Sequence, residues 1–124
     1  MQFLLIGLGG GIGAVTRFLV GRTVQRLLQS PSFPWGTVLV NVSGCLVIGF
    51  LAGLHEQRQI FSANARCFVF IGCLGGYTTF STFGYETLAL ARDGETLLAL
   101  GNVALQVVPG LFAVWLGATA ARLL

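Results

Sequence analysis

The sequence predicts an all-α membrane protein of four transmembrane helices, and three features support this fold class. Hydrophobic residues make up 55% of the 124 residues and charged residues only 9%, against about 25% charged in a soluble domain. Four apolar stretches are each long enough to cross a hydrocarbon core of about 30 Å as helix, which takes roughly 20 residues. The connections between them are too short to hold a soluble domain. Helix is the expected form because lipid cannot satisfy the backbone of an open strand.

The predicted spans form a single four-helix transmembrane domain over residues 1–124. They cover residues 3–20, 35–54, 67–91 and 97–121, each boundary being approximate. Glycine pairs four residues apart recur in these spans, and small-xxx-small pairs predict faces where helix backbones approach closely. The pairs are Gly7 and Gly11, Gly9 and Gly13, Gly49 and Gly53, and Gly72 and Gly76.

The charges give almost no preference for one orientation in the membrane. All seven basic residues are arginines, and four spans place both termini and the middle loop on one side. That side carries Arg58, Arg66 and Arg122, and the other carries Arg17, Arg22, Arg26 and Arg92. Because an excess of Lys and Arg on one side normally sets orientation, two possibilities stay open. The chain inserts both ways up and pairs as an antiparallel homodimer, or a partner fixes a weakly biased chain.

The stretch GGYTTFSTFG, residues 75–84, interrupts the third span. Gly75-Gly76 is a weak point for helix, and the Thr and Ser side chains that follow can bond to backbone in place of the regular ladder. We therefore expect a break near residues 75–80, with two half-helices meeting inside the membrane. Freed carbonyls at such a break can hold a cation. Non-helical backbone at that depth must be buried in protein or line a cavity, so the break predicts a site.

Polar side chains also fall on one face of the second span and one face of the fourth. Thr37 and Asn41 lie one helical turn apart, as do Asn102 and Gln106. Polar groups inside a membrane mark a pathway by default. Hydrogen bonding between helices is the alternative for the three amides.

Phe80 and Phe83 share a face if the second half of the third span is helical. A phenyl ring is positive at its edge, so ring edges turned toward a pore would attract a small anion without holding it. Core packing is the alternative. The roles of two charged residues also stay open. Arg17 either snorkels to headgroups or draws anions into a vestibule, and Glu86 either pairs at a surface or lies at a pore mouth.

Three ordered motifs resemble the CrcB/Fluc family of fluoride channels over essentially the full length of the chain. The first is Gly9-Gly10-x-x-Gly13-Ala14-x-x-Arg17-Phe18, and the second is Pro34-x-Gly36-Thr37-x-x-Val40-Asn41-x-x-Gly44. The third is Gly75-Gly76-x-Thr78-Thr79-Phe80-Ser81-Thr82-Phe83. The chain departs from the family on the fourth helix, which often carries hydroxyl residues in the family and here offers Asn102 and Gln106.

The resemblance implies a passive fluoride-selective channel that exports cytoplasmic fluoride and confers fluoride resistance on a microbe. It implies an antiparallel, dual-topology homodimer with two pores, placed in the bacterial cytoplasmic (inner) membrane. The fluoride pore would be lined by Asn41, Phe80 and Phe83, and we extend it to Thr37, Thr79, Ser81, Asn102 and Gln106, with Arg17 at a vestibule. A structural sodium ion would lie at the dimer centre, held by the backbone carbonyls of Gly75 and Thr78 from each subunit.

Other functions fit the sequence less well. A small multidrug-type proton-coupled transporter also has four short spans, but it needs a membrane-embedded carboxylate, usually on the first helix, and residues 3–20 contain no Asp or Glu. A non-transporting assembly subunit explains the glycines but not the polar break with two phenylalanines. We expect no enzyme and no catalytic residues, because no nucleophile–base pair can be drawn. The expected partners are fluoride, lipid and a second copy, and no nucleic acid.

Overall fold

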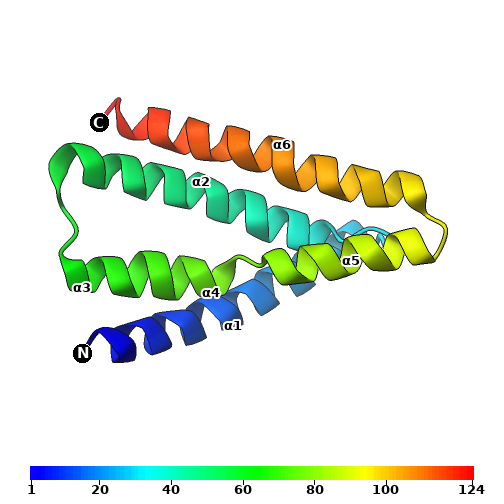
Figure 1. The fold of residues 1–124 in the computed structure, drawn as a ribbon, viewed down its shortest axis with the longest axis horizontal. Coiled ribbons are helices and arrows are strands. Elements are labelled where there is room, and N and C mark those ends of the chain that lie inside the picture. Colours follow the sequence, from blue (N-terminus) through cyan, green and yellow to red (C-terminus); the bar gives the residue numbers. More distant parts are fainter.

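The structure, a computed structural model, describes all residues 1–124 and is helical from end to end (Figure 1). Four helical spans are long and apolar enough to cross a membrane, which confirms the predicted fold class. The elements are α1 (Gln2–Leu28), α2 (Trp35–Arg58), α3 (Ala63–Arg66), η1 (Cys67–Leu74), α4 (Gly75–Tyr77), α5 (Phe80–Arg92) and α6 (Thr96–Ala121). The third span comprises α3, η1, α4 and α5, with a gap after Tyr77.

The first two helices are longer than the apolar stretches that predicted them. Helix α1 continues to Leu28 instead of residue 20, and α2 continues to Arg58 instead of residue 54. The apolar stretch ends before the helix ends, because the Arg and Gln residues that follow are polar but still favour helix. Each helix ends where a glutamine adopts the left-handed conformation, with φ 47° at Gln29 and φ 50° at Gln59, and the NH of each glutamine bonds back to a carbonyl of the last turn.

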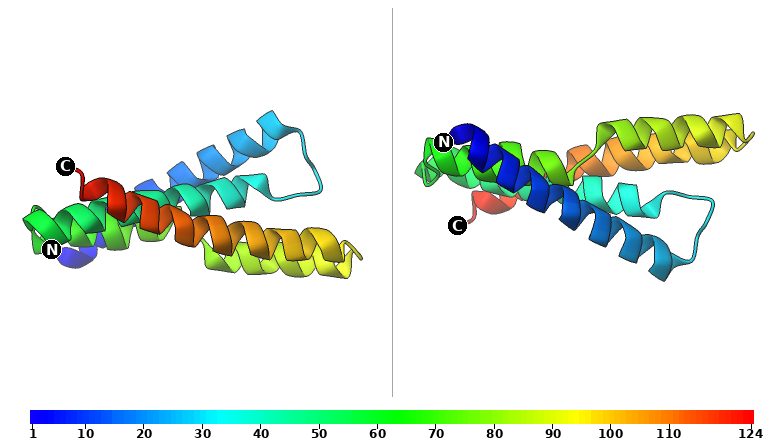
Figure 2. Two further views of the ribbon diagram at one scale, coloured as in Figure 1. Left: turned by 90° about the horizontal axis from the view of Figure 1, so that it is seen from above. Right: turned by 90° about the horizontal axis from the view of Figure 1, so that it is seen from below.

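Both termini and the α2–α3 connection lie at one end of the bundle, and the α1–α2 loop and the α5–α6 turn lie at the other (Figure 1). Helix α6 packs along α2, and α1 packs on η1 and α4. Figure 2 shows that the α1–α2 loop diverges from the α5–α6 pair, which leaves the bundle open at this end.

Glycines set the closest helix contacts. A Cβ on Gly9 would lie 2.5 Å from the Phe68 carbonyl oxygen, and one on Gly76 would lie 2.5 Å from the Gly10 carbonyl oxygen. Gly49 and Gly53 likewise meet α6, so three of the four predicted pairs lie in close contacts. The Gly7–Gly11 pair is the exception, because it faces away from the bundle with nothing within 4 Å.

The single chain buries little of itself. Only 19 of its 124 residues are buried, and large apolar side chains are exposed along every span. An exposed apolar surface of this extent is unstable in water and needs lipid or protein to cover it. The structure is therefore that of a multi-pass membrane protein.

Candidate functional site

The third span is interrupted at two threonines. Thr78 has φ −84° and ψ 159°, and Thr79 has φ −152° and ψ 114°, so both are extended. Helix α5 then begins at Phe80, because Thr79 acts as its N-cap and Oγ1 accepts the Thr82 NH at 3.2 Å. The break therefore falls within the predicted residues 75–80, but after the glycines, which are helical.

The turns before the break are also irregular. Residues 67–74 form the π-helix η1, in which the Gly75 NH reaches back to the Phe70 carbonyl. Such wide turns are rare and often occur at functional sites. The backbone bonds of the break leave the Gly75 carbonyl without its usual helical partners. The NH of Thr78 bonds to the Leu74 carbonyl at 3.0 Å and the NH of Thr79 bonds to Asn41 Oδ1, so neither is available to the Gly75 carbonyl.

Asn41 of α2 supplies the hydrogen bonds that the backbone of Thr79 would otherwise make within a helix. Its Oδ1 accepts the Thr79 NH at 2.8 Å, and its Nδ2 donates to the Thr79 carbonyl at 3.0 Å. The same Nδ2 donates to Gln106 Oε1 at 2.9 Å. All hydrogen-bonding atoms of the Asn41 carboxamide are therefore engaged within the chain.

From Asn41 the hydrogen bonds continue through α6 to α5. Gln106 Nε2 donates to Asn102 Oδ1 at 3.5 Å, and Asn102 Nδ2 donates to Thr87 Oγ1 at 2.9 Å. The Thr87 hydroxyl donates to the Phe83 carbonyl at 2.8 Å. We call Asn41, Gln106, Asn102 and Thr87 the amide chain. Asn102 is 0% exposed and Gln106 is 9% exposed, and their amides hydrogen-bond α6 to α5 and to α2.

A cavity of about 390 Å³ opens at the break, and we call it the break cavity. It contains most of the predicted pore residues together with both predicted sodium ligands. The Phe80 and Phe83 rings lie 5.4 Å apart at 66°, one edge toward the other face. Phe80 is 83% exposed and so projects beyond the single chain. The site residues that line the cavity are Asn41, Gly75, Thr78, Thr79, Phe80, Phe83 and Gln106.

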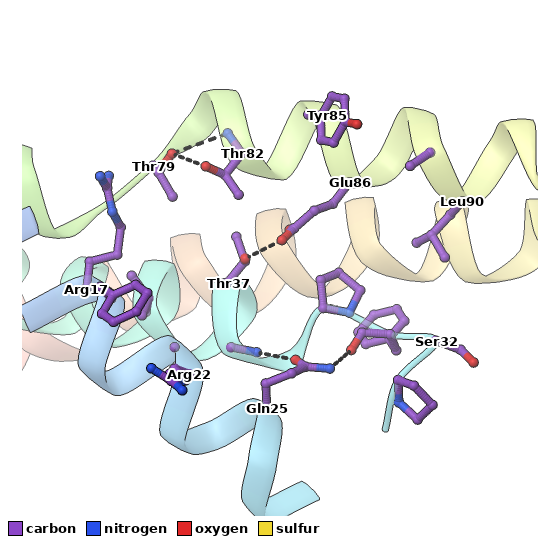
Figure 3. A pocket seen from close by; sticks show the side chains of 18 of the residues that line it. Arg17, Arg22, Gln25, Ser32, Thr37, Thr79, Thr82, Tyr85, Glu86 and Leu90 are labelled. Carbon is purple, nitrogen blue, oxygen red and sulfur yellow. Dashed lines mark hydrogen bonds between the residues drawn. The ribbon is translucent and has the colours of Figure 1, made fainter. Parts of the chain in front are cut away.

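A second cavity of about 600 Å³, the vestibule, lies between α1, the α1–α2 loop, α2 and α5 (Figure 3). Within it Thr37 Oγ1 donates to Glu86 Oε1 at 2.8 Å, while Glu86 Oε2 is buried without a hydrogen-bond partner. Arg17 enters from α1 and donates from a guanidinium nitrogen to the Thr78 carbonyl at 3.2 Å. Thr79, the residue that Asn41 holds, lines both cavities.

Three of the predicted pore residues lie outside the break cavity. Thr37 belongs to the vestibule, Asn102 lines neither cavity, and Ser81 is exposed with its Oγ 3.4 Å from Thr79 Oγ1. Sequence reasoning missed Thr87, although its position one turn after Phe83 was a usable signal. It also missed Gln25, whose Nε2 donates to the Phe33 carbonyl at 2.9 Å and whose Oε1 accepts the Gly36 NH at 3.2 Å. These bonds fasten the loop that walls the vestibule.

The break fits a small hard cation by its chemistry. Carbonyl oxygens of unwound membrane helices are ligands that Na⁺ takes. The Gly75 carbonyl is free of the Thr78 and Thr79 NH groups. The Thr78 carbonyl accepts one bond from Arg17 and keeps a second lone pair.

Comparison with known proteins gives a consistent result. A family model described as CrcB-like protein, Camphor Resistance (CrcB), matches residues 4–118. The chain is 49% identical over 119 residues to the fluoride-specific ion channel FluC of Methylocella silvestris, covering 94% of this chain and 90% of that one. It is 44% identical over 116 residues to FluC of Methylobacillus flagellatus (94% and 91%) and 48% identical over 121 residues to FluC of Opitutus terrae (96% and 91%).

Proposed function

Because this chain belongs to the CrcB family, we propose that it is a passive, fluoride-selective channel that lets cytoplasmic fluoride leave the cell and so confers fluoride resistance. The proposal is supported by relatives at 44–49% identity that carry the name fluoride-specific ion channel and align over nearly the whole chain. A channel of this kind performs no covalent chemistry, so we assign no catalytic residue.

One observation in the structure carries the proposal: Thr79, whose backbone Asn41 holds, lines both the vestibule and the break cavity. An anion enters the vestibule, where Arg17 contributes a positive charge. It then passes the amide of Asn41 and reaches the ring edges of Phe80 and Phe83. The break cavity offers these groups without a cationic side chain on its lining. Weak, successive contacts of this kind suit conduction, because an ion held too tightly does not leave.

The channel unit in this proposal is an antiparallel homodimer with two pores. The exposure of the break supports this dimer, since Gly75 and Phe80 both lie at the surface of the single chain. A second, inverted copy on this face would close the open side of the break cavity. The near balance of arginines between the two ends of the bundle favours insertion both ways up. We place the dimer in the bacterial cytoplasmic (inner) membrane.

We also propose a structural sodium ion at the dimer centre. Gly75 and Thr78 of each subunit would hold it through their backbone carbonyls, and its charge would neutralise carbonyl dipoles that converge there. Its role is to fasten the two breaks together. The Gly75 carbonyl receives neither the Thr78 NH nor the Thr79 NH, which supports this assignment.

Fluoride efflux from proteoliposomes tests the proposed function. Purified protein is reconstituted with fluoride inside, without a proton gradient, and release is followed with a fluoride electrode. We expect rapid fluoride release and negligible release of chloride in a parallel preparation. Equal release of both ions, or no release of fluoride, would overturn the proposal. Release that requires a proton gradient would instead favour the proton-coupled transporter.

A further inference from the structure

The hydrogen bonds of the amide chain all run in one direction. The Thr79 NH donates to Asn41, Asn41 to Gln106, Gln106 to Asn102, Asn102 to Thr87, and Thr87 to the Phe83 carbonyl. The two ends are backbone groups, whose donor and acceptor identities cannot change. This direction makes Gln106 present its carbonyl oxygen, an acceptor, to Asn41.

This direction leaves Asn41 without a free amide hydrogen for the break cavity. One bond from Asn41 Nδ2 goes to the Thr79 carbonyl and the other to Gln106 Oε1, and a primary amide has only two hydrogens. An anion can therefore bind to Asn41 only by displacing one of these two acceptors, and of the two it is the side-chain oxygen of Gln106 that can turn away without moving the backbone. Once displaced, that oxygen would repel the anion unless the Gln106 amide turned.

Beyond Asn41, the hydrogen bonds between side chains of the amide chain can reverse their direction while the backbone stays in place. The terminal torsions of Asn and Gln have broad, two-fold preferences, and a threonine hydroxyl both donates and accepts. After both amides turn, the Thr87 hydroxyl donates to Asn102 Oδ1 and Asn102 Nδ2 donates to Gln106 Oε1. The fully buried Asn102 stays paired, so no desolvated group is left open. The Gln106–Asn102 bond is the longest of the amide chain at 3.5 Å, so it is the hydrogen bond that breaks most easily when the direction reverses.

We propose that Gln106 is the second hydrogen-bond donor for the anion, and that it becomes one when the amide chain reverses. Gln106 Nε2 and Asn41 Nδ2 then converge on the ion in the break cavity. The proposal rests on the proposed fluoride channel and adds a source of specificity. Reversal gives up the Asn41–Gln106 bond and the Thr87–Phe83 bond, and only an anion that accepts strong hydrogen bonds offsets that loss. Fluoride does so far better than chloride.

Side-chain amide resonances of the wild-type protein test this reversal directly. The protein is labelled with ¹⁵N in Asn and Gln, placed in lipid nanodiscs and titrated with sodium fluoride, with sodium chloride as the parallel series. We expect the Asn41, Gln106 and Asn102 amides to shift together with fluoride and not with chloride. A shift of Asn41 alone, or no shift at Gln106 and Asn102, would overturn the proposal.

A substitution at Gln106 distinguishes two roles of this side chain, that of a donor to the anion and that of an acceptor that competes with the anion for Asn41. The two roles predict opposite changes in fluoride affinity. Gln106→Met keeps the length of the side chain and removes both functions. If Gln106 donates to the anion, fluoride affinity falls about ten- to a hundredfold, the effect of losing one hydrogen bond to a charged group. If Gln106 only competes for Asn41, affinity rises, and a rise or no change would overturn the proposal. Gln57→Met, at an exposed glutamine near the end of α2, is the matched control.

The two levels of the proposal fail in different ways. A wild-type protein that releases no fluoride from proteoliposomes would overturn the channel function and this inference with it. Selective fluoride release by the wild type, combined with unchanged or tighter binding by Gln106→Met, would overturn only the role of Gln106.

Discussion

Asn41 pairs with the backbone of Thr79 as one strand residue pairs with another. The side chain accepts the Thr79 NH at 2.8 Å and donates to the Thr79 carbonyl at 3.0 Å. A helix break inside a membrane exposes backbone groups that lipid cannot satisfy, and each such group costs several kcal/mol if left alone. One carboxamide on α2 thus makes the interruption of the third span tolerable and holds it in one conformation.

Asn41→Asp should destabilise the protein and suppress fluoride transport. The carboxylate keeps an acceptor for the Thr79 NH, but its second oxygen then faces the Thr79 carbonyl, which has no hydrogen to share. Leaving such a group unsatisfied costs about 1–3 kcal/mol or more when it is charged. Thermal unfolding in detergent and fluoride efflux measure the two effects. Asn64→Asp, at an exposed asparagine of α3, is the control, and equal behaviour of the two variants would refute the pairing role.

Glycine-to-alanine substitutions should distinguish glycines that lie in helix contacts from glycines that do not, by their effect on stability. Gly76→Ala places a Cβ 2.5 Å from the Gly10 carbonyl oxygen, where backbone cannot yield, while Gly7→Ala meets nothing within 4 Å. We expect Gly76→Ala to destabilise the chain by about 1–3 kcal/mol through overpacking. Gly7→Ala should be neutral or slightly stabilising, because Ala favours helix by about 0.5–1 kcal/mol. Thermal unfolding midpoints in detergent decide the point, and similar midpoints for the two variants would contradict the packing of α1 on α4.

The sequence was sufficient for the spans and for the existence of the break, and the reason is local chemistry. Apolar length predicts a membrane helix, and Thr79 carries its own N-cap hydroxyl. The exact place of the break was harder to predict, because it depends on tertiary partners. Gly75 and Gly76 remain helical, and Gly76 serves contact with Gly10 instead of flexibility. The interruption occurs where Asn41, far away in sequence, supplies replacement bonds.

The candidate site was predictable as a set of residue types but not as a network. Asn102 and Gln106 stand one turn apart, which suggests a shared polar face. Their burial and their orientation depend on Thr87 and Asn41, which lie on two other helices. No periodicity within a helix carries that information. The π-helical turns of η1 escaped prediction for the same reason, since CFVFIGCL reads as ordinary apolar helix.

Replacing either ring of the break cavity should slow fluoride efflux. Phe80→Ile and Phe83→Ile each remove a ring edge and the contact between the rings, which lie 5.4 Å apart. Ring interactions of this kind are worth about 0.5–1.5 kcal/mol, so we expect efflux to slow by several-fold up to about tenfold. Size-exclusion chromatography should show the same oligomeric state as the wild type. Phe112→Ile, on the exposed face of α6, is the control, and normal efflux through both variants would reject the ring-edge hypothesis.

Arg17→Gln should lower fluoride flux and flatten its dependence on ionic strength. The arginine brings a positive charge to the vestibule and donates to the Thr78 carbonyl. A charge lining a cleft raises the local concentration of counter-ions, and salt screens this effect. Initial efflux rates at several ionic strengths measure the change. Arg26→Gln removes the same charge from the same helix outside the vestibule; if both variants show the same slope, Arg17 does not attract the anion.

Removing sodium should weaken both the dimer and its transport. If Gly75 and Thr78 carbonyls of two subunits share one Na⁺, the ion binds the folded dimer and not the separated chains. A ligand at a hundred times its Kd then stabilises the bound state by about 2.7 kcal/mol. We expect the thermal midpoint and the dimer fraction to fall when Na⁺ is replaced by K⁺ at equal ionic strength, and fluoride efflux to fall in parallel. Identical midpoints and efflux rates in the two salts would remove sodium from the dimer centre and leave the Gly75 carbonyl to another partner.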